Sequence, residues 1–175
     1  MFQCETVSVR LSILNIEIIP AGRSHIPVMH QLACLYRYDL SEFANWPVPA
    51  DGRYVYHGLE AYWEEGYTPL LLKVNDGLAG FVILAHDKKS GEADFEYVEF
   101  FVIRKYRGRG VGKTVATALF NQYRGQWVVR QLLANKPAIA FWKKLLSEYM
   151  NNAYKASTEQ DPEFGEVHVL RFCNQ

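Results

Sequence analysis

A strand–turn–helix pattern over Phe100–Leu119, FFVIRKYRGRGVGKTVATAL, constrains the fold more than any other part of the sequence. An apolar run, predicted to be a strand over Ala93–Ile103, leads into a turn that contains Gly108, Gly110 and Gly112. Apolar residues at helical spacing follow the turn, and strands that alternate with helices indicate one α/β domain with a mixed sheet. The first N–H groups of a helix have no partner within the helix and lie at the positive end of its dipole. The turn is therefore suited to hold a phosphate or pyrophosphate group.

The charge of the chain is balanced, so the basic residues around this turn are distinctive. The 19 Lys and Arg residues equal the 19 Asp and Glu residues in number. A neutral chain lacks the positive field of a general nucleic-acid binder, and we expect no nucleic-acid partner. Five basic residues lie in or beside the turn: Arg104, Lys105, Arg107, Arg109 and Lys113.

Length and residue usage narrow the remaining classes of protein. The 175 residues fit a single domain over positions 1–175. No apolar run approaches the about 18 residues that span a bilayer, so no membrane is expected. The three cysteines are far apart and odd in number, which favours reduced thiols in a cytoplasmic protein. The five histidines lack the spacing of a metal site, and we predict no metal.

Three kinds of glycine-rich turn compete for the segment. The dinucleotide-binding pattern G-x-G-x-x-G fails, because its third glycine would fall on Lys113. The nucleotide P-loop, G-x-x-x-x-G-K-[ST], matches at Gly112, Lys113 and Thr114 but requires a glycine where Arg107 stands. The third pattern, R/Q-x-x-G-x-G, is matched by Arg107, Gly110 and Gly112.

This third pattern, together with a second motif, resembles the GNAT superfamily of N-acetyltransferases. The family motif N-x-x-A-x-x-[FL]-Y is matched at Asn135, Ala138 and Phe141, one predicted strand after the glycine turn. The resemblance extends over about Leu70–Leu146, and it is closest to an uncharacterised bacterial subgroup in which tryptophan, here Trp142, follows the phenylalanine.

The resemblance implies a central mixed, mostly antiparallel sheet of about six or seven strands, flanked by helices, with a splayed strand pair that holds acetyl-CoA. It implies direct acetyl transfer to an amine in a ternary complex, with a small molecule or peptide as acceptor, and a homodimer is compatible with it. The positions that match its cofactor-binding segments are Phe100, Phe101, Val102, Arg107, Gly108, Arg109, Gly110, Val111, Gly112, Lys113, Asn135 and Trp142.

The acetyl transfer requires a base for the amine and a way for the thiolate to leave. Glu96 and Glu99 are the candidate bases in the predicted strand, and Glu99 is preferred because it immediately precedes the segment that positions the thioester in the family. The resemblance further implies that the backbone N–H of Val102 binds the oxyanion.

Trp142 departs from the family pattern, which has a proton-donating tyrosine at this position. An indole N–H cannot supply that proton near neutral pH. Another tyrosine, such as Tyr149 or one from the aromatic segment Tyr36–Tyr56, could replace it, or the thiolate could leave without an acid, since thiols have a pKa of about 8.5. A non-catalytic acyl-CoA-binding or sensing module is the alternative function, followed by a P-loop nucleotide-binding protein.

The aromatic segment Tyr36–Tyr56 is predicted to be irregular and to line the acceptor site, where Asp39 and Glu42 could attract a cationic amine. Elsewhere we predict a first strand at Leu11–Ile19, a hairpin around Asn75-Asp76-Gly77 and a loop at His86–Glu92. Two terminal strands are predicted near Asn152–Ser157 and Glu166–Phe172.

Overall fold

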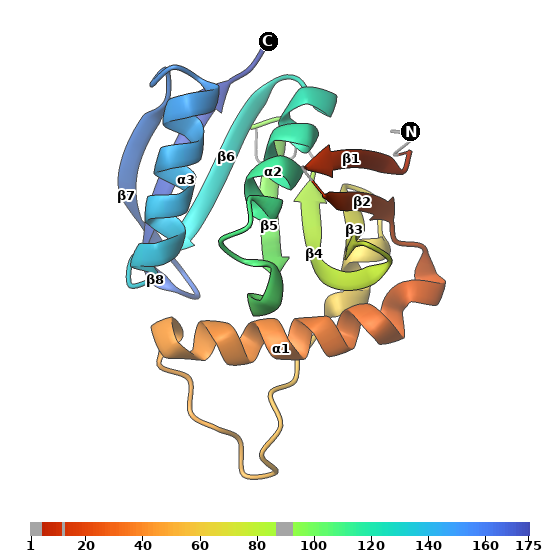
Figure 1. Ribbon diagram of the computed structural model, residues 1–175. Coiled ribbons are helices and arrows are strands. Elements are labelled where there is room, and N and C mark those ends of the chain that lie inside the picture. The colour runs from red at the N-terminus through yellow and green to blue at the C-terminus, as the bar shows by residue number, and fades with distance from the viewer. Residues whose placement is uncertain (1–4, 12, 87–92) are drawn as a thin grey trace.

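One mixed sheet organises the chain (Figure 1), and the computed structural model describes residues 5–11, 13–86 and 93–175 of it. Within these residues eight strands are ordered β1-β2-β3-β4-β5-β6-β8-β7, and every neighbouring pair is antiparallel except β5–β6. The strands are β1 (Val7–Leu11), β2 (Leu14–Pro20), β3 (Tyr67–Val74), β4 (Gly77–Ala85), β5 (Phe95–Val102), β6 (Gln126–Leu132), β7 (Lys155–Asp161) and β8 (Gly165–Cys173). The predicted α/β class and mostly antiparallel sheet are confirmed, with eight described strands where six or seven were expected.

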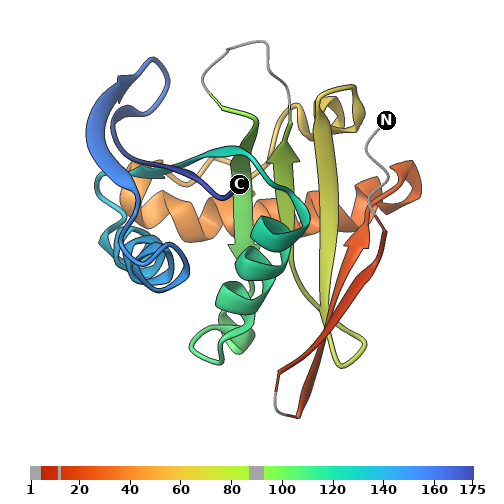
Figure 2. The ribbon, with the colours of Figure 1, turned by 90° about the horizontal axis from the view of Figure 1, so that it is seen from above.

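Helices cover both faces of the sheet (Figure 2). The long helix α1 (Ile26–Ala44) lies against one face, where Met29 and Leu32 pack with Phe81 and Ile83 of β4. The helices α2 (Val111–Gln122) and α3 (Lys136–Tyr149) lie against the other face, where Phe120 belongs to the larger cluster of buried residues. Short 3₁₀ turns occupy Arg23–His25, Leu59–Trp63 and Arg104–Tyr106. None of the described helices is long and apolar enough to cross a membrane.

The parallel pair β5–β6 is joined only at one end. Pairing covers Phe95–Tyr97 of β5 and Trp127–Val129 of β6, after which no further register between the two strands is formed. The C-terminal half of β5 stays paired with β4 on its other side. The predicted splayed strand pair is therefore confirmed, and it leaves one edge of β5 open.

A β-bulge in β5 sets which side chains face which layer. Ile83 of β4 pairs with Glu99, whereas Leu84 pairs with Tyr97, so Val98 is an extra residue. Side chains on a regular strand alternate, and an added residue reverses the alternation beyond it. Tyr97 accordingly packs in the cluster of α2 and α3, while Phe101 packs in the cluster of α1, although the two residues are four positions apart in the sequence. Glu99, two residues before Phe101, is thereby turned to the α1 face.

The structure confirms some of the local predictions and corrects others. The hairpin at Asn75-Asp76 is confirmed, and both residues have the positive φ of a two-residue hairpin turn. The strand expected at Leu11–Ile19 is confirmed over Leu14–Ile19, which belongs to β2, but Leu11 is the last residue of the preceding strand β1, which pairs with β2. The two terminal strands are confirmed as a hairpin that extends further than predicted, and most of the loop His86–Glu92 lies outside the described residues.

The aromatic segment Tyr36–Tyr56 is irregular only in its second part. The helix α1 continues to Ala44 and ends at Asn45, which adopts a left-handed conformation. Tyr36, Leu40 and Phe43 recur at helical spacing and all line the same groove, so these apolar side chains form one face of a helix and do not belong to a loop. The chain beyond Asn45 passes through two prolines without regular structure up to the 3₁₀ turn.

Gly80 on β4 provides a test of how closely β4 and β5 are packed. It has a φ of +151°, and a Cβ built there would lie 1.9 Å from the Phe101 carbonyl oxygen. We expect Gly80→Ala to cost about 2–4 kcal/mol of unfolding free energy, since the backbone of β5 must move. Urea denaturation measures this loss, and Gly22→Ala is the control because a Cβ at Gly22 meets nothing within 4 Å. Equal stability of the two variants would contradict the packing described here.

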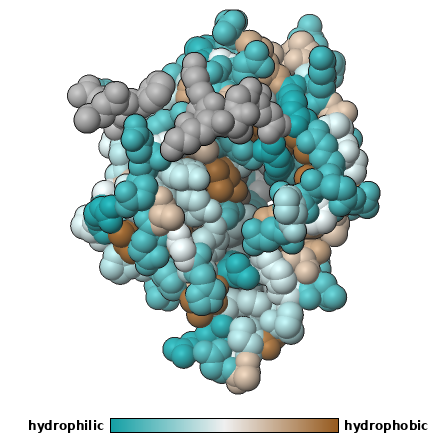
Figure 3. Space-filling view, turned by 180° about the vertical axis from the view of Figure 1, so that it is seen from behind, coloured by the Kyte–Doolittle hydropathy of each residue, from teal (hydrophilic) through white to brown (hydrophobic). Residues whose placement is uncertain are grey.

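The surface seen from behind in Figure 3 is mostly hydrophilic, with hydrophobic residues in small, separate patches. Such scattered patches are ordinary for a protein surface and do not by themselves indicate a docking face.

Candidate active site

The glycine turn joins β5 to α2 and exposes the start of that helix. Gly108 and Gly110 have φ values of +70° and +81°, which side-chain-bearing residues rarely adopt. Thr114 N–H donates to the Gly110 carbonyl at 2.9 Å, so the intrahelical bonds begin there. The N–H groups of Val111, Gly112 and Lys113 precede this bond and therefore lack intrahelical partners.

The third glycine of the turn serves helix packing. A Cβ at Gly112 would lie 3.3 Å from Cζ of Phe141 on α3, so glycine lets α2 and α3 approach each other. Val111 is buried in the core, and only its backbone can take part in binding. Arg109 is exposed and does not line the groove that begins at Gly108 and Gly110.

A groove with a volume of about 810 Å³ extends from the turn between α1, α3 and the open edge of β5. Its walls contain most of the residues predicted to bind the cofactor: Phe100, Phe101, Val102, Arg107, Gly108, Gly110, Gly112, Lys113, Asn135 and Trp142. The structure thus brings together two motifs that are separated by β6 in the sequence. The volume of the groove is in the usual range for small-molecule sites.

The open edge of β5 presents backbone groups to this groove. Ile103 N–H donates to the Ala79 carbonyl on the β4 side, and backbone groups alternate in direction along a strand. Phe100 and Val102 therefore direct their N–H and C=O groups away from β4. The Val102 carbonyl accepts a hydrogen bond of 2.7 Å from Nε of Arg107, which agrees with this direction.

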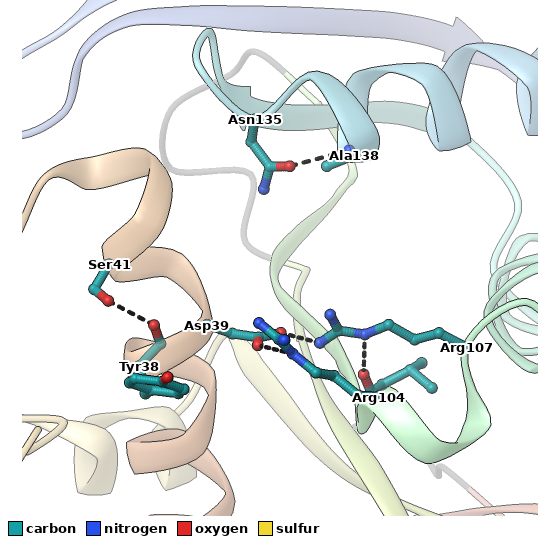
Figure 4. Close-up of polar contacts among 8 residues, drawn as sticks. Tyr38, Asp39, Ser41, Arg104, Arg107, Asn135 and Ala138 are labelled. Atoms are coloured by element: carbon teal, nitrogen blue, oxygen red, sulfur yellow. Dashed lines mark hydrogen bonds and ion pairs between the residues drawn. The ribbon is translucent and has the colours of Figure 1, made fainter.

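Asp39 of α1 holds two arginines of the turn (Figure 4). One carboxylate oxygen accepts from Nε of Arg104 at 2.7 Å, and the other pairs with the Arg107 guanidinium. Asp39 and Glu42 both line the groove of the turn, and the attraction of an acceptor amine by them stays a prediction. Both residues face the groove because α1 continues through both positions.

Lys113 forms an ion pair with Glu148 of α3 across the groove. Both side chains are largely exposed, and exposed ion pairs contribute little to stability. Lys113 can therefore exchange this partner at small cost.

A second cavity, with a volume of about 480 Å³, lies on the other side of the open edge. Its walls include Glu96 and Glu99 together with aromatic residues of α1 and of the irregular segment. Six residues line both the groove and this cavity, which we call the junction: Tyr36, Leu40, Phe100, Asn135, Ala138 and Trp142. A molecule bound along the groove can therefore reach a molecule in the second cavity at the junction.

Glu99 lies among tyrosine hydroxyls at the wall of the second cavity. The Tyr56 hydroxyl donates to its carboxylate, and the Tyr62 hydroxyl lies 3.0 Å from that of Tyr56. Burial raises the pKa of Glu99, and hydrogen bonds from the Tyr36 and Tyr56 hydroxyls partly lower it. A carboxylate with a raised pKa is a stronger base than an exposed one, which suits it to accept a proton from an amine.

Glu96 has a different environment from Glu99. It forms an ion pair with Arg130 of β6, and both side chains are about one-quarter to one-third exposed. It lies before the bulge, in the part of β5 that is paired with β6. The ion pair occupies the carboxylate that would have to accept a proton, so the geometry favours Glu99 over Glu96 as the base.

Two motif residues of α3 have structural roles. Asn135 caps the helix, because its Oδ1 accepts from the Ala138 N–H at 3.1 Å. Trp142 is 5% exposed and stacks on Tyr97 with ring centroids 5.3 Å apart. Tyr149, at the far end of α3, donates to Asn121 at 3.0 Å and lines neither cavity, so the expectation that it could donate to the thiolate is wrong.

Comparison with known proteins identifies the family. Residues 32–146 match the family model described as the acetyltransferase (GNAT) family, which is more than half of the chain. The chain therefore belongs to the GNAT family of acetyltransferases, and its enzyme class is that of the acyltransferases. No curated protein has a significantly similar sequence.

Solved structures share this fold at low sequence identity. An acetyltransferase from Thermus thermophilus has a TM-score of 0.66 and 12% identity, over 90% of this chain and 96% of that one. The acetyltransferase from Salmonella typhimurium that modifies the N-terminal serine of ribosomal protein L7/L12 has a TM-score of 0.64 and 16% identity, over 91% and 95%. The Escherichia coli ribosomal-protein-S18-alanine N-acetyltransferase has a TM-score of 0.57 and 14% identity, over 91% and 94%. At such identities the likeness concerns the fold alone.

Proposed function

We propose that the chain transfers an acetyl group from acetyl-CoA directly to an amine while both substrates are bound. The observation that carries this proposal is the junction, where the groove that begins at the glycine turn meets the cavity that contains Glu99. Family membership supports acetyl-CoA as the donor, and it favours this function over a P-loop nucleotide-binding protein.

The cofactor is proposed to lie along the groove. Its pyrophosphate would accept hydrogen bonds from the backbone N–H groups of residues 111–113 at the positive end of α2. Its pantetheine arm would use the backbone groups of Phe100 and Val102, and the Val102 N–H would stabilise the oxyanion. Asn135 and Trp142 would then form the wall beside the thioester, in agreement with their place at the junction.

Glu99 is the proposed base. An amine reaches the site mostly protonated, and it must lose that proton before its nitrogen can attack the thioester carbonyl. Glu99 would accept the proton directly or through water, since it lines the acceptor cavity and burial raises its pKa. The nitrogen–carbon bond then forms as the carbon–sulfur bond breaks.

Tyr36 is the proposed donor to the leaving thiolate. It lines both cavities and is packed against Phe81 and Phe101, and burial, followed by its interaction with Glu99, raises its pKa. A raised pKa keeps the hydroxyl protonated before the reaction but also makes it a weaker acid, so its transfer of a proton to sulfur depends on the return of a proton from Glu99. Tyr36 would give its proton to the sulfur and recover one from Glu99, so that the net transfer is from the amine to CoA.

We expect Tyr36→Phe to lower kcat by about 10²-fold or more, the usual effect of losing a general acid, with unchanged affinity for acetyl-CoA. Tyr149→Phe is the matched control, since its hydroxyl lies away from both cavities. Steady-state rates and acetyl-CoA titrations measure the two quantities. If Tyr36→Phe retains the wild-type kcat, the thiolate leaves without help from this residue.

Release of free CoA thiol in the presence of a broad panel of amines, polyamines and peptides tests the proposed function. We expect release with at least one amine, and competition for the groove by CoA but not by ATP. Tight binding of acetyl-CoA without thiol release from any acceptor would instead support a non-catalytic acyl-CoA-binding module.

A further inference from the structure

We propose that the acceptor is a small dibasic amine, whose reacting nitrogen lies at Glu99 while a second cationic group lies at Glu163. This inference rests on the proposed function, because it concerns the acceptor of the same site. Three features of the second cavity support it: the carboxylates on its walls, their available partners, and the aromatic rings between them.

The turn between β7 and β8 brings acidic and aromatic side chains to the cavity. Asp161, Glu163 and Phe164 all line it, although they are far from the family motifs in the sequence. The Asp161 carboxylate fixes the turn, because its Oδ1 accepts from the N–H groups of Glu163 and Phe164 at 2.9 Å each. Phe164 remains 44% exposed, so an apolar ring is left at the cavity wall.

The charges around the cavity sum to a negative value. Its walls hold four carboxylates against two guanidinium groups and one imidazole, so acidic groups outnumber basic ones. The Arg130 guanidinium pairs with Glu96, and the Arg37 guanidinium lies 4.1 Å from the centroid of the Trp46 ring. The Asp161 carboxylate already accepts two hydrogen bonds from backbone N–H groups of its own turn.

Two carboxylates are left for a ligand, namely Glu99 and Glu163. Glu163 forms no ion pair within the part of the chain that the structure describes. Burial is the main cause of the raised pKa of Glu99 and of Tyr62, and the charge of Glu163 adds a smaller contribution to both. A cation placed between Glu163 and Glu99 would be attracted by both and would relieve their repulsion.

Aromatic rings complete a binding site for a cation. Tyr36, Tyr56 and Tyr62 surround Glu99, and Trp46 and Phe164 lie further along the walls. Aromatic faces attract ammonium groups and pack against the methylene chain between two of them. The volume of about 480 Å³ is suited to a small molecule. An acceptor with a carboxylate at its second end would face Glu163 and be disfavoured.

Three amines of equal chain length test the acceptor class: putrescine with two cations, butylamine with one, and γ-aminobutyrate with an opposing carboxylate. At low ionic strength we expect kcat/KM for putrescine to exceed that for butylamine by about 10-fold, with γ-aminobutyrate slowest, and this order to weaken as salt is added. Glu163→Gln should lower the putrescine value by about 10-fold and the butylamine value by a clearly smaller factor, because butylamine has no second cation to lose its partner. Glu166→Gln, an exposed residue of the same hairpin outside the cavity, should change neither.

Equilibrium titration of the CoA-bound protein with the same amines separates this inference from the proposed function. Preferential binding of putrescine that Glu163→Gln removes, without any acetyl transfer, would contradict the proposed function and support the dibasic ligand. Acetyl transfer with equal kcat/KM for putrescine and butylamine, or an equal loss for both in Glu163→Gln, would overturn the dibasic acceptor and leave the proposed function intact.

Discussion

Gly110→Asp is expected to abolish the binding of acetyl-CoA. The substitution adds a carboxylate at the N-terminus of α2, where the pyrophosphate is proposed to lie. Two unit charges of like sign about 4 Å apart repel by about 4 kcal/mol at an effective dielectric of 20, which corresponds to about 10³-fold weaker binding. Isothermal titration of acetyl-CoA into the variant measures the loss.

The protein should remain folded in this variant. The φ of +81° at this position strains any side chain, but Asp tolerates the left-handed region better than most residues, and the close neighbour of the added Cβ is the flexible end of Leu11, at 2.9 Å. Gly52→Asp is the matched control, because Gly52 has a similar φ of +72° and nothing within 4 Å of an added Cβ. Wild-type affinity for acetyl-CoA in a folded Gly110→Asp variant would refute the placement of the pyrophosphate.

Glu99→Gln is expected to lower kcat by about 10²–10⁴-fold, which is the usual contribution of a general base. The amide preserves the size of the side chain and can still accept a hydrogen bond from Tyr56. Affinity for acetyl-CoA should not change, since Glu99 does not line the groove. Glu96→Gln is the paired variant, and a larger loss of kcat there would reverse the assignment of the base.

The pH dependence separates the catalytic role of Glu99 from a structural one. Because the pKa of Glu99 is raised in the folded protein, kcat/KM should rise with pH through a limb above the about 4.3 of an exposed glutamate. This limb should be missing in Glu99→Gln. Folding favours the protonated carboxyl, so the stability from this group is present at low pH and is lost as pH rises through the folded pKa. We therefore expect Glu99→Gln to be at least as stable as the wild type at pH 7, by thermal unfolding.

The sequence predicted the part of the site that is formed by residues close together in the chain. The glycine turn and α2 depend on residues of one strand–turn–helix segment, and the Asn135 cap depends on the first residues of α3. The spacing of these residues can therefore be recognised in the sequence without knowledge of the tertiary structure. The splayed pair followed from the family resemblance, and the sheet confirms it. The division of Leu11–Ile19 between β1 and β2 was missed because no glycine or proline in this stretch marks a change of strand.

The acceptor side of the site could not be predicted, since it is assembled from distant segments. The bulge at Val98 leaves no recognisable mark in the sequence, yet it decides that Glu99 faces Tyr36 and Tyr56. Glu163 gave no signal either, because it belongs to a polar hairpin turn that only tertiary structure brings to the cavity. Asp39 drew attention for its charge, but two arginines of the glycine turn occupy it.

Initial rates measured while acetyl-CoA and an amine acceptor are varied together test the central claim most directly. Direct transfer at the junction predicts that free CoA thiol and acetylated amine form in equal amounts, and that reciprocal plots of rate intersect because both substrates must be bound. Parallel plots would indicate an acetylated enzyme intermediate, and bound acetyl-CoA that never yields acetylated amine would indicate no transfer. Either result would contradict the account.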